Sequence, residues 1–405
     1  MFRLTQFMQA LAAPEAAPAP RKPKGPVVIW NLIRRCNLCC KHCYSISADT
    51  DFPGELSTAQ VFSVMEDLKQ FKVPALILSG GEPLLRPDIH RIARQARELG
   101  FYVGLSTNGT LIDAGSIDAV EASRFDYVGI SIDGIGATHD AFRRLDGAFA
   151  KSMAAVRLCR ERDLKVGLRF TLTQDNAEEL PDLLDLMDEH QVDKFYLSHL
   201  NYAGRGNRNR GDDVVHGMTR QAMDLLFDRC WKEIQSGVNR EYVTGNNDAD
   251  GVYLLLWVRE HLPHLEEFAR GRLEAWGGNS SGVNVANIDN LGNVHPDTFW
   301  WEYHLGNVKT RPFSEIWADR SDPLMAGLNQ HPRPLKGRCG ECGYRAICGG
   351  NTRVRAYQLS GDPWAEDPAC YLRDEEIGVE ASSARLQVVP FNRGRDREIK
   401  QHGIQ

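Results

Sequence analysis

Short apolar runs alternate with longer amphipathic stretches through the first half of the chain. Gly, Asn or Asp bounds most of these runs, which is typical of buried parallel strands. Between them, apolar residues recur at helical spacing, as at Val61, Val64 and Leu68. The runs cover 27–33, 75–78, 102–105, 127–132, 166–172 and 195–200, and the helical stretches cover 58–71, 88–99, 150–162 and 177–190. Six consecutive strand–helix units predict an α/β fold with a parallel sheet, either doubly wound or closed towards a barrel.

The pattern changes on both sides of this region. Residues 1–26, which are rich in Ala and Pro from residue 12 onward, predict a flexible leader. Residues 27–213 hold the alternating units. A helical pattern over 214–271 predicts a connector. Short strands, Gly-rich turns and a group of cysteines over 272–375 predict a further domain. Residues 376–405, rich in Arg, Asp and Glu, predict a loosely held tail.

Composition excludes several classes of protein. The chain has 405 residues with 48 Lys and Arg against 54 Asp and Glu, a formal charge of −6. A general nucleic-acid binder would be basic, so we expect no nucleic-acid partner. No apolar run approaches the roughly 18 residues that a membrane span needs, so we expect no membrane segment. The N-terminus lacks the pattern of a signal peptide, and the protein is predicted to be cytoplasmic.

Eight of the ten cysteines fall into two groups. In a large chain without secretion signals, such grouping favours metal or redox chemistry over disulfides. The first group follows the first predicted strand, and its members are Cys36, Cys39, Cys40 and Cys43. Three thiolates suit an iron–sulfur cluster that leaves one iron open for a chelating ligand. Spacing alone also allows a zinc site with His42, or a triplet that uses Cys39 in place of Cys40.

Motifs at the ends of four strands resemble those of the radical S-adenosylmethionine (SAM) family. Cys36–Cys43 reads CNLCCKHC, and SGGEP, STNG and SIDG follow the next three strands at 79–83, 106–109 and 131–134. The resemblance implies a partial (β/α)6 TIM-type barrel that holds a [4Fe–4S] cluster on Cys36, Cys40 and Cys43. It also implies SAM contacts from Gly80, Gly81, Glu82, Thr107, Asn108, Ser131, Asp133 and Arg169. Taken singly, each of these residues could serve only a turn or a cap.

The second group, Cys339, Cys342, Cys348 and Cys370, supplies four thiolates. Four thiolates saturate either an iron–sulfur cluster or a tetrahedral zinc. The region 272–375 resembles a SPASM domain, the C-terminal module of a subgroup of radical SAM enzymes, which carries auxiliary [4Fe–4S] clusters. One ligand set of that module is complete here, whereas Asp297 and Thr352 stand where the other set has cysteines. We therefore expect one auxiliary cluster, and two [4Fe–4S] clusters in all.

Candidate substrate residues follow the sixth predicted strand. Arg205 and Arg208 could bind carboxylates at the mouth of the barrel, because Arg pairs bidentately with them. His199 could bind a substrate's iron or act as an acid or base. A solvated basic loop and a packed strand histidine explain the same residues equally well.

Segments 30–57, 78–89, 104–113 and 348–372 most resemble the radical SAM enzymes of haem d1 biosynthesis. The resemblance implies an iron tetrapyrrole substrate, 12,18-didecarboxysirohaem, with two propionates replaced by oxo groups through a 5′-deoxyadenosyl radical. It also implies a reductant such as flavodoxin or ferredoxin. One alternative is another SAM–SPASM enzyme, either a haem-precursor decarboxylase or a peptide-modifying maturase. A second alternative is a zinc or electron-transfer protein without catalysis.

Overall fold

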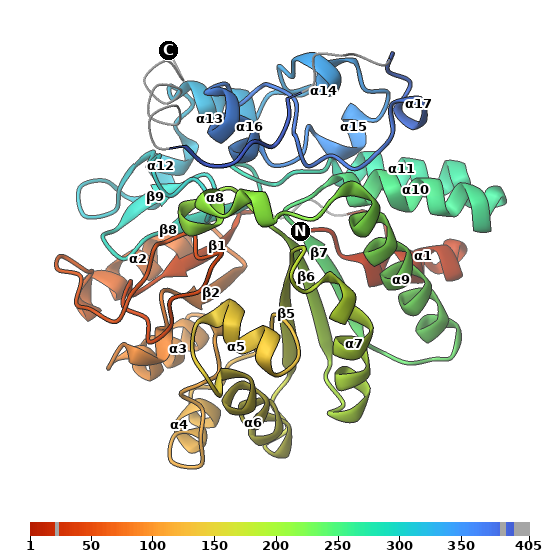
Figure 1. Ribbon diagram of the computed structural model, residues 1–405. Helices are drawn as coiled ribbons and strands as arrows, with labels where there is room; N and C mark the ends of the chain where they lie inside the picture. The colour runs from red at the N-terminus through yellow and green to blue at the C-terminus, as the bar shows by residue number, and fades with distance from the viewer. Residues whose placement is uncertain (21–23, 381–385, 393–405) are drawn as a thin grey trace.

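The computed structural model describes residues 1–20, 24–380 and 386–392. Ten strands form one sheet in the order β10-β9-β8-β1-β2-β3-β4-β5-β6-β7 (Figure 1). The strands are β1 (Val27–Asn31), β2 (Ala75–Ser79), β3 (Tyr102–Thr107), β4 (Tyr127–Ser131), β5 (Val166–Leu172), β6 (Lys194–His199), β7 (Glu241–Gly245), β8 (Val285–Ile288), β9 (Asn293–His295) and β10 (Gly306–Asn307). In this order, all neighbouring strands between β8 and β7 pair in parallel. Strand β9 pairs antiparallel with both β8 and β10. The predicted α/β fold with a partial barrel is confirmed, and β1–β6 match the six predicted strands.

Helices cover the outer face of the curved sheet and build the C-terminal region (Figure 1). They are α1 (Leu4–Ala12), α2 (Thr58–Gln70), α3 (Ile89–Glu98), α4 (Ile117–Ala122), α5 (Ala137–Arg143), α6 (Ala148–Glu161), α7 (Leu180–Glu189), α8 (Gly204–Arg208), α9 (His216–Gln235), α10 (Ala249–His261), α11 (Glu266–Trp276), α12 (Phe313–Ala318), α13 (Pro323–Leu328), α14 (Gly337–Glu341), α15 (Arg345–Cys348), α16 (Arg353–Ser360) and α17 (Asp374–Ile377). None of these helices is both long and apolar enough to cross a membrane.

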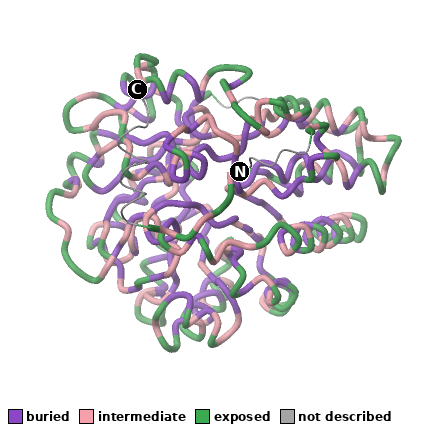
Figure 2. The backbone as a smooth tube through the Cα atoms, turned by 45° about the horizontal axis from the view of Figure 1, so that its top comes forward, coloured by how far each residue is buried: buried purple, intermediate pink, exposed green. Residues whose placement is uncertain are grey.

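The core lies between the sheet and its outer helices. Side chains alternate along each strand. Val28 and Trp30 of β1 point away from the barrel interior towards the outer helices, where both are fully buried. Helix α2 begins at a capping box, in which the Ser57 hydroxyl accepts from the Gln60 N–H and the Gln60 side chain accepts from the Ser57 N–H. Figure 2 shows the resulting buried centre with exposure concentrated at the periphery. The packing of this core holds the carboxyl ends of the parallel strands together at one edge of the sheet.

The N-terminal segment differs from the predicted flexible leader. Residues Leu4–Ala12 form helix α1, in which Leu4 and Met8 are fully buried. The Phe2 N–H donates to the Thr244 carbonyl at 2.7 Å, which fixes the segment against β7, the last strand of the sheet. The prediction was wrong for this part because apolar residues at helical spacing outweigh the adjacent Ala/Pro-rich stretch.

The predicted connector and C-terminal domain are both continuous with the sheet. Strand β7 lies within 214–271 and pairs in parallel with β6, so this region is not purely helical. Strand β8 pairs in parallel with β1 and extends the barrel sheet on its other side. The sheet therefore continues across the predicted domain boundary at residue 272. Backbone hydrogen bonds join β8, which follows this boundary in sequence, to β1, which precedes it.

The predicted tail is partly fixed. Its first residues, Glu376 and Ile377, are the end of α17 (Asp374–Ile377), and the Arg210 Nε donates to the Val389 carbonyl at 2.6 Å. The Arg210 guanidinium also lies 5.7 Å from the ring centre of Phe391. The tail is therefore not loosely held at these points. The remaining residues of the predicted tail, 381–385 and 393–405, lie outside the described part of the chain.

Candidate active site

The first cysteine group lies on the loop that leaves the carboxyl end of β1. Cys36 and Cys40 are buried beside Leu38, Cys43 packs against them, and Cys39 is exposed. This arrangement brings together the three cysteines that the motif indicated and leaves Cys39 outside. Within the described ranges, no three His, Cys, Asp or Glu side chains surround a single metal-ion position. Each thiolate of an iron–sulfur cube binds a different iron, so a cluster does not require such convergence.

Two glycines allow the end of β2 to lie against this loop. The Gly81 N–H donates to the Ile33 carbonyl at 2.7 Å, and the Glu82 N–H donates to the Arg35 carbonyl at 2.9 Å. A Cβ on Gly80 would overlap the Ile33 carbonyl, and one on Gly81 would overlap the Arg35 carbonyl. The glycines were predicted to admit a ligand. In the described chain they admit the backbone that leads into Cys36.

Glu82 joins the ends of β2 and β3. Its side chain is fully buried and accepts from the Thr107 hydroxyl at 2.8 Å and the Asn108 N–H at 2.8 Å. A third bond comes from the Leu84 N–H at 3.1 Å. Burial raises the pKa of Glu82 to about 7, although these hydrogen bonds act in the opposite direction. Because the carboxyl group is held by three internal donors, its first role is to position the loop after β3.

Asn108 continues this chain of contacts to the cysteine loop. Its Nδ2 donates to the Asn37 Oδ1 at 2.9 Å and lies 4.0 Å from the Cys36 sulfur. Asn37 in turn donates to the Thr110 hydroxyl at 2.8 Å. The ends of β2 and β3 thus fix the orientation of the first cysteine through buried and partly buried polar groups.

Arg143, a buried arginine that the sequence analysis missed, reaches Cys40. The Arg143 Nη1 lies 3.5 Å from the Cys40 sulfur, and its Nη2 forms an ion pair with Asp133. Asp133 also accepts from the Thr171 N–H at 2.7 Å. Burial lowers the pKa of Arg143, but Asp133 and Cys40 outweigh it and raise the pKa above its usual value. Nothing in the sequence separates Arg143 from the exposed Arg144 beside it.

Ser131 and Arg169 lie side by side on the inward face of the barrel. They are register partners on β4 and β5. The Arg169 guanidinium lies 5.0 Å from the ring centre of Tyr196, and no ion pair involves it among the described residues. A cation held in this position by an aromatic ring is available to an anionic ligand inside the barrel.

The four C-terminal cysteines line one hollow together with Arg338 and Arg345. The Arg338 Nη1 lies 3.0 Å from the Cys370 sulfur. Backbone N–H groups point at two other sulfurs, from Asp367 to Cys339 at 3.4 Å and from Tyr344 to Cys342 at 3.4 Å. Burial raises the pKa of Cys339 to about 11. Four sulfurs with cationic and N–H donors fit a thiolate-bound cluster, since these donors stabilise thiolate charge.

Comparison with known proteins decides the family. Residues 30–187 match the family described as the radical SAM superfamily. A pre-heme d1 synthase of Dinoroseobacter shibae is 58% identical over 393 residues, which are 96% of this chain and 97% of that protein. The chain belongs to the radical SAM superfamily. Radical SAM enzymes use a [4Fe–4S] cluster and SAM, and the three-cysteine loop is the matching feature here.

Two further proteins resemble this radical SAM enzyme over most of its length. An Fe-coproporphyrin III synthase of Methanosarcina barkeri is 42% identical over 88% of this chain and 90% of that protein. The crystal structure of SuiB from Streptococcus suis has a TM-score of 0.66 at 18% identity, over 86% of this chain and 78% of that one. This likeness of fold extends beyond the barrel, and the C-terminal region is SPASM-like.

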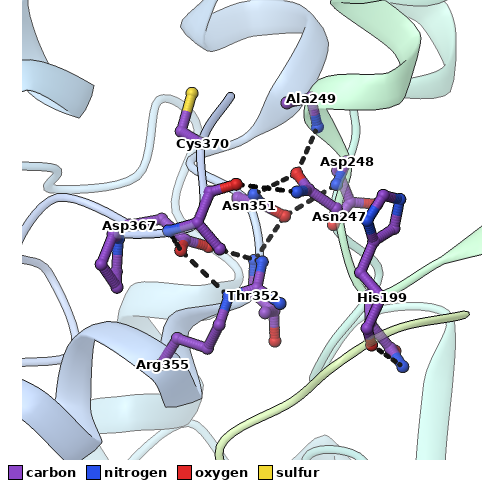
Figure 3. A network of polar contacts seen from close by, with 12 residues as sticks. His199, Asn247, Asp248, Ala249, Asn351, Thr352, Arg355, Asp367 and Cys370 are labelled. Carbon is purple, nitrogen blue, oxygen red and sulfur yellow. Dashed lines mark hydrogen bonds and ion pairs between the residues drawn. The ribbon is translucent and has the colours of Figure 1, made fainter. Parts of the chain in front are cut away.

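Buried polar groups fix the C-terminal region of this radical SAM enzyme onto the barrel (Figure 3). The Asp248 N–H donates to the Asn351 Oδ1 at 2.7 Å, and the Asn351 Nδ2 donates to the Asn247 Oδ1 at 2.5 Å. Arg355 and Asp367 form an ion pair at 2.9 Å with neither side chain exposed. This network begins just after β7 and ends next to Cys370, so the second cysteine group is held firmly against the barrel.

The positions that lack cysteines in this radical SAM enzyme are filled by internal contacts. Asp297 is buried and accepts from the Phe299 N–H at 2.7 Å. Thr352 is 2% exposed, and its N–H donates to the Asn351 Oδ1 at 3.0 Å. Neither residue supplies a thiolate.

His199 does not face the barrel interior. It shares a face of β6 with Phe195 and Leu197, both fully buried in the core, because side chains alternate along a strand. Its Nε2 lies 3.0 Å from the Asp250 Oδ2, and its ring stacks on Tyr371 at 6.2 Å. The predicted substrate role of His199 is therefore wrong, and it is a packed strand histidine.

The two arginines after β6 differ in their surroundings. The Arg205 Nε donates to the Cys40 carbonyl at 2.7 Å and its Nη1 to the Ser47 carbonyl at 2.9 Å. Arg205 is buried against the cysteine loop, so its predicted role as a carboxylate ligand at the mouth is replaced by loop support. Arg208 is exposed, and its predicted contact with substrate stays a prediction.

Proposed function

We propose that this radical SAM enzyme is a pre-heme d1 synthase that acts on an iron tetrapyrrole. The observation that carries the proposal is 58% identity with the Dinoroseobacter shibae protein over 96% of the chain. The substrate is 12,18-didecarboxysirohaem, and two of its propionate side chains are replaced by oxo groups. The two cysteine groups support this reaction, since Arg143 lies against a sulfur of the first group and Arg338 against a sulfur of the second.

Cys36, Cys40 and Cys43 hold the SAM-binding cluster in this proposal. Their side chains pack in one cluster, and Asn108 and Arg143 approach the sulfurs of Cys36 and Cys40 at 4.0 and 3.5 Å. When bound, the cluster and SAM supply the 5′-deoxyadenosyl radical that removes a hydrogen atom from a propionate. Arg143 stabilises the thiolate charge, and Glu82 keeps the loop after β3 in place.

Ser131 and Arg169 bind the carboxylate of SAM from the inward face of the barrel. Their adjacency in register and the absence of a carboxylate partner for Arg169 in the described chain support this role. Gly80 and Gly81 bring their own backbone close to the cysteine loop, so SAM meets main-chain groups of this segment. Asp133 acts through Arg143 and is a positioning residue.

Cys339, Cys342, Cys348 and Cys370 hold one auxiliary [4Fe–4S] cluster. The shared hollow and the Arg338 contact with Cys370 support this assignment. The lack of a thiol at Asp297 and Thr352 supports a single auxiliary set. Arg208, exposed near the cysteine loop, is retained as a candidate contact for a substrate carboxylate.

The test uses full-length protein reconstituted anaerobically with iron and sulfide. We expect about eight irons per chain, two clusters of four, and 5′-deoxyadenosine on reduction with SAM. Cys40→Ala should abolish 5′-deoxyadenosine formation. Cys370→Ser should lose about four irons while the first cluster and its SAM binding remain.

Substrate identity is decided by mass spectrometry. The proposal predicts loss of two propionates from 12,18-didecarboxysirohaem in the wild-type enzyme, and none in Cys40→Ala. Turnover of Fe-coproporphyrin precursors in place of this substrate would favour the activity named for the Methanosarcina barkeri relative. Zinc without iron, and no 5′-deoxyadenosine, would contradict the proposal altogether.

A further inference from the structure

The inner face of the barrel sheet is accessible. Along β2, Leu76 and Leu78 point outward and are fully buried, whereas Ile77 points inward and is partly exposed. The same alternation occurs on β1 and β6, whose inward side chains Ile29 and Tyr196 are also only partly buried. Side chains fill a closed eight-stranded barrel, but within the described residues the end strands of this sheet, β10 and β7, do not pair. The inner face therefore borders a space that a ligand can enter.

Trp301 lies on this inner face, over β8 and β9. Ile29, Asn287 and His295 are successive register partners on β1, β8 and β9, so their side chains share the inward face. The Trp301 ring stacks on the His295 ring, with 5.8 Å between the ring centres and 7° between the planes. Trp301 therefore adds an aromatic layer to the inner face at this end of the sheet.

Tyr44 connects Trp301 to the first cysteine group. Tyr44 directly follows Cys43, and its hydroxyl accepts from the Asn31 Nδ2 at 2.6 Å. Asn31 is the last residue of β1 and lies two residues after an inward side chain, so it also points inward. The Tyr44 ring meets Phe299 at 5.6 Å and Trp301 at 5.8 Å, in both cases edge to face. We call Tyr44, Phe299 and Trp301 the aromatic wall.

The exposure and the support of the aromatic wall suit it to a ligand. Its three rings are only partly buried, whereas the adjacent Trp300 is 2% exposed in the core. The ring of His295 beneath Trp301 is fixed, because its Nδ1 lies 2.7 Å from the Tyr303 carbonyl and its Nε2 lies 3.3 Å from the Asp289 Oδ2. A fixed support holds the indole in one orientation, which lowers the entropic cost of stacking a ligand on it.

We propose that the aromatic wall is the surface on which the tetrapyrrole substrate stacks, with Trp301 as its main contact. The inference rests on the proposed function, which supplies the flat conjugated macrocycle. Aromatic rings stack with their centres about 4.5–7 Å apart, and Trp301 offers the indole face that is turned away from His295. Because Tyr44 follows Cys43, a macrocycle on the aromatic wall lies beside the first cysteine group.

The experiment measures how tightly 12,18-didecarboxysirohaem binds to the full-length enzyme, reconstituted anaerobically and loaded with SAM. The change in the visible absorption band of the tetrapyrrole is the readout. Trp301→Leu should weaken binding about tenfold, because it removes the stacking surface. Trp301→Phe keeps an aromatic face and should bind within about threefold of wild type. Both variants should contain as much iron as wild type, because Trp301 is no cluster ligand.

Trp231→Leu is the matched control. Trp231 is also partly buried and also meets another ring edge to face, that of Trp257 at 5.9 Å. It belongs to α9, which lies outside the sheet (Figure 1). The same change of residue there should leave the affinity for the tetrapyrrole unchanged.

Several results would overturn the stacking role of Trp301. An unchanged affinity in Trp301→Leu would do so, and so would equal weakening by Trp231→Leu or by Trp301→Phe. Loss of iron from Trp301→Leu would show that the residue supports the cysteine loop, which also counts against stacking. A wild-type protein that binds no tetrapyrrole would contradict the proposed function itself, whereas the other results leave that function intact.

Discussion

One buried side chain, Arg143, links the cysteine loop to the interior of the barrel. It contacts the Cys40 sulfur at 3.5 Å and pairs with Asp133, which in turn accepts from the end of β5. A cation beside a ligand thiolate stabilises the more negative state of a bound cluster. Arg143 therefore acts on the electronics of the site as well as on its shape.

Replacing Arg143 should lower the reduction potential of the SAM-binding cluster. A hydrogen bond to a charged group contributes about 1.5–3 kcal/mol, which corresponds to roughly 65–130 mV for one electron. Arg143→Met should shift the potential down by this order, and Arg143→Lys by less because it keeps the charge. A redox titration followed by electron paramagnetic resonance measures both, and an unchanged potential in Arg143→Met would remove this role.

At the scale of elements, the backbone at the end of β2 lies in close contact with the cysteine loop. Gly80 and Gly81 have no Cβ, and the carbonyls of Ile33 and Arg35 occupy the space that a Cβ would need. The two segments then exchange backbone hydrogen bonds as two short strands do. The motif at residues 79–83 is thus a structural clamp on the loop that bears the cysteines.

Gly81→Ala should displace this loop and lower the rate of SAM cleavage by about a hundredfold, since small misplacements in a reacting site have large effects. Gly271→Ala is the matched control, because the space around Gly271 in α11 is open. That variant should cleave SAM within about twofold of wild type, since Ala favours a helix. Equal activity of the two variants would show that the clamp is dispensable.

The sequence predicted those parts of the fold and site that repeat a local pattern. Strands β1–β6 and helices α2, α3, α6 and α7 follow from periodicity, and the division of the cysteines into two groups follows from their spacing. It could not predict Arg143 or the true setting of His199, because burial on a particular face depends on neighbours distant in sequence. Strand β7 was missed for the same reason: five residues of mixed polarity become a strand only beside β6.

At the scale of the whole molecule, one sheet unites the two cysteine groups. Strand β1 leads into the first group and is flanked by β2 on one side and β8 on the other. Strand β8 belongs to the C-terminal region, which also carries the second group. The two sites are therefore held by a common framework and are not two separable modules.

A chain that ends at residue 271 should fail to fold into a soluble barrel. It lacks β8, so the backbone of β1 becomes an open edge, which promotes aggregation. A chain that ends at residue 380 keeps every strand found in the described residues and should stay soluble. Soluble yield and size-exclusion chromatography compare the two, and a monodisperse 1–271 fragment would contradict the idea of a shared framework.

The pairing of β1 with β8 also has a consequence for biosynthesis. On the ribosome, β1 and the cysteine loop emerge early, whereas residues 285–288 emerge only after most of the chain has been made. Until then the strand that carries the loop lacks one of its two partners. The strand that leads into the first cysteine group therefore has both of its neighbours only once residues 285–288 have emerged.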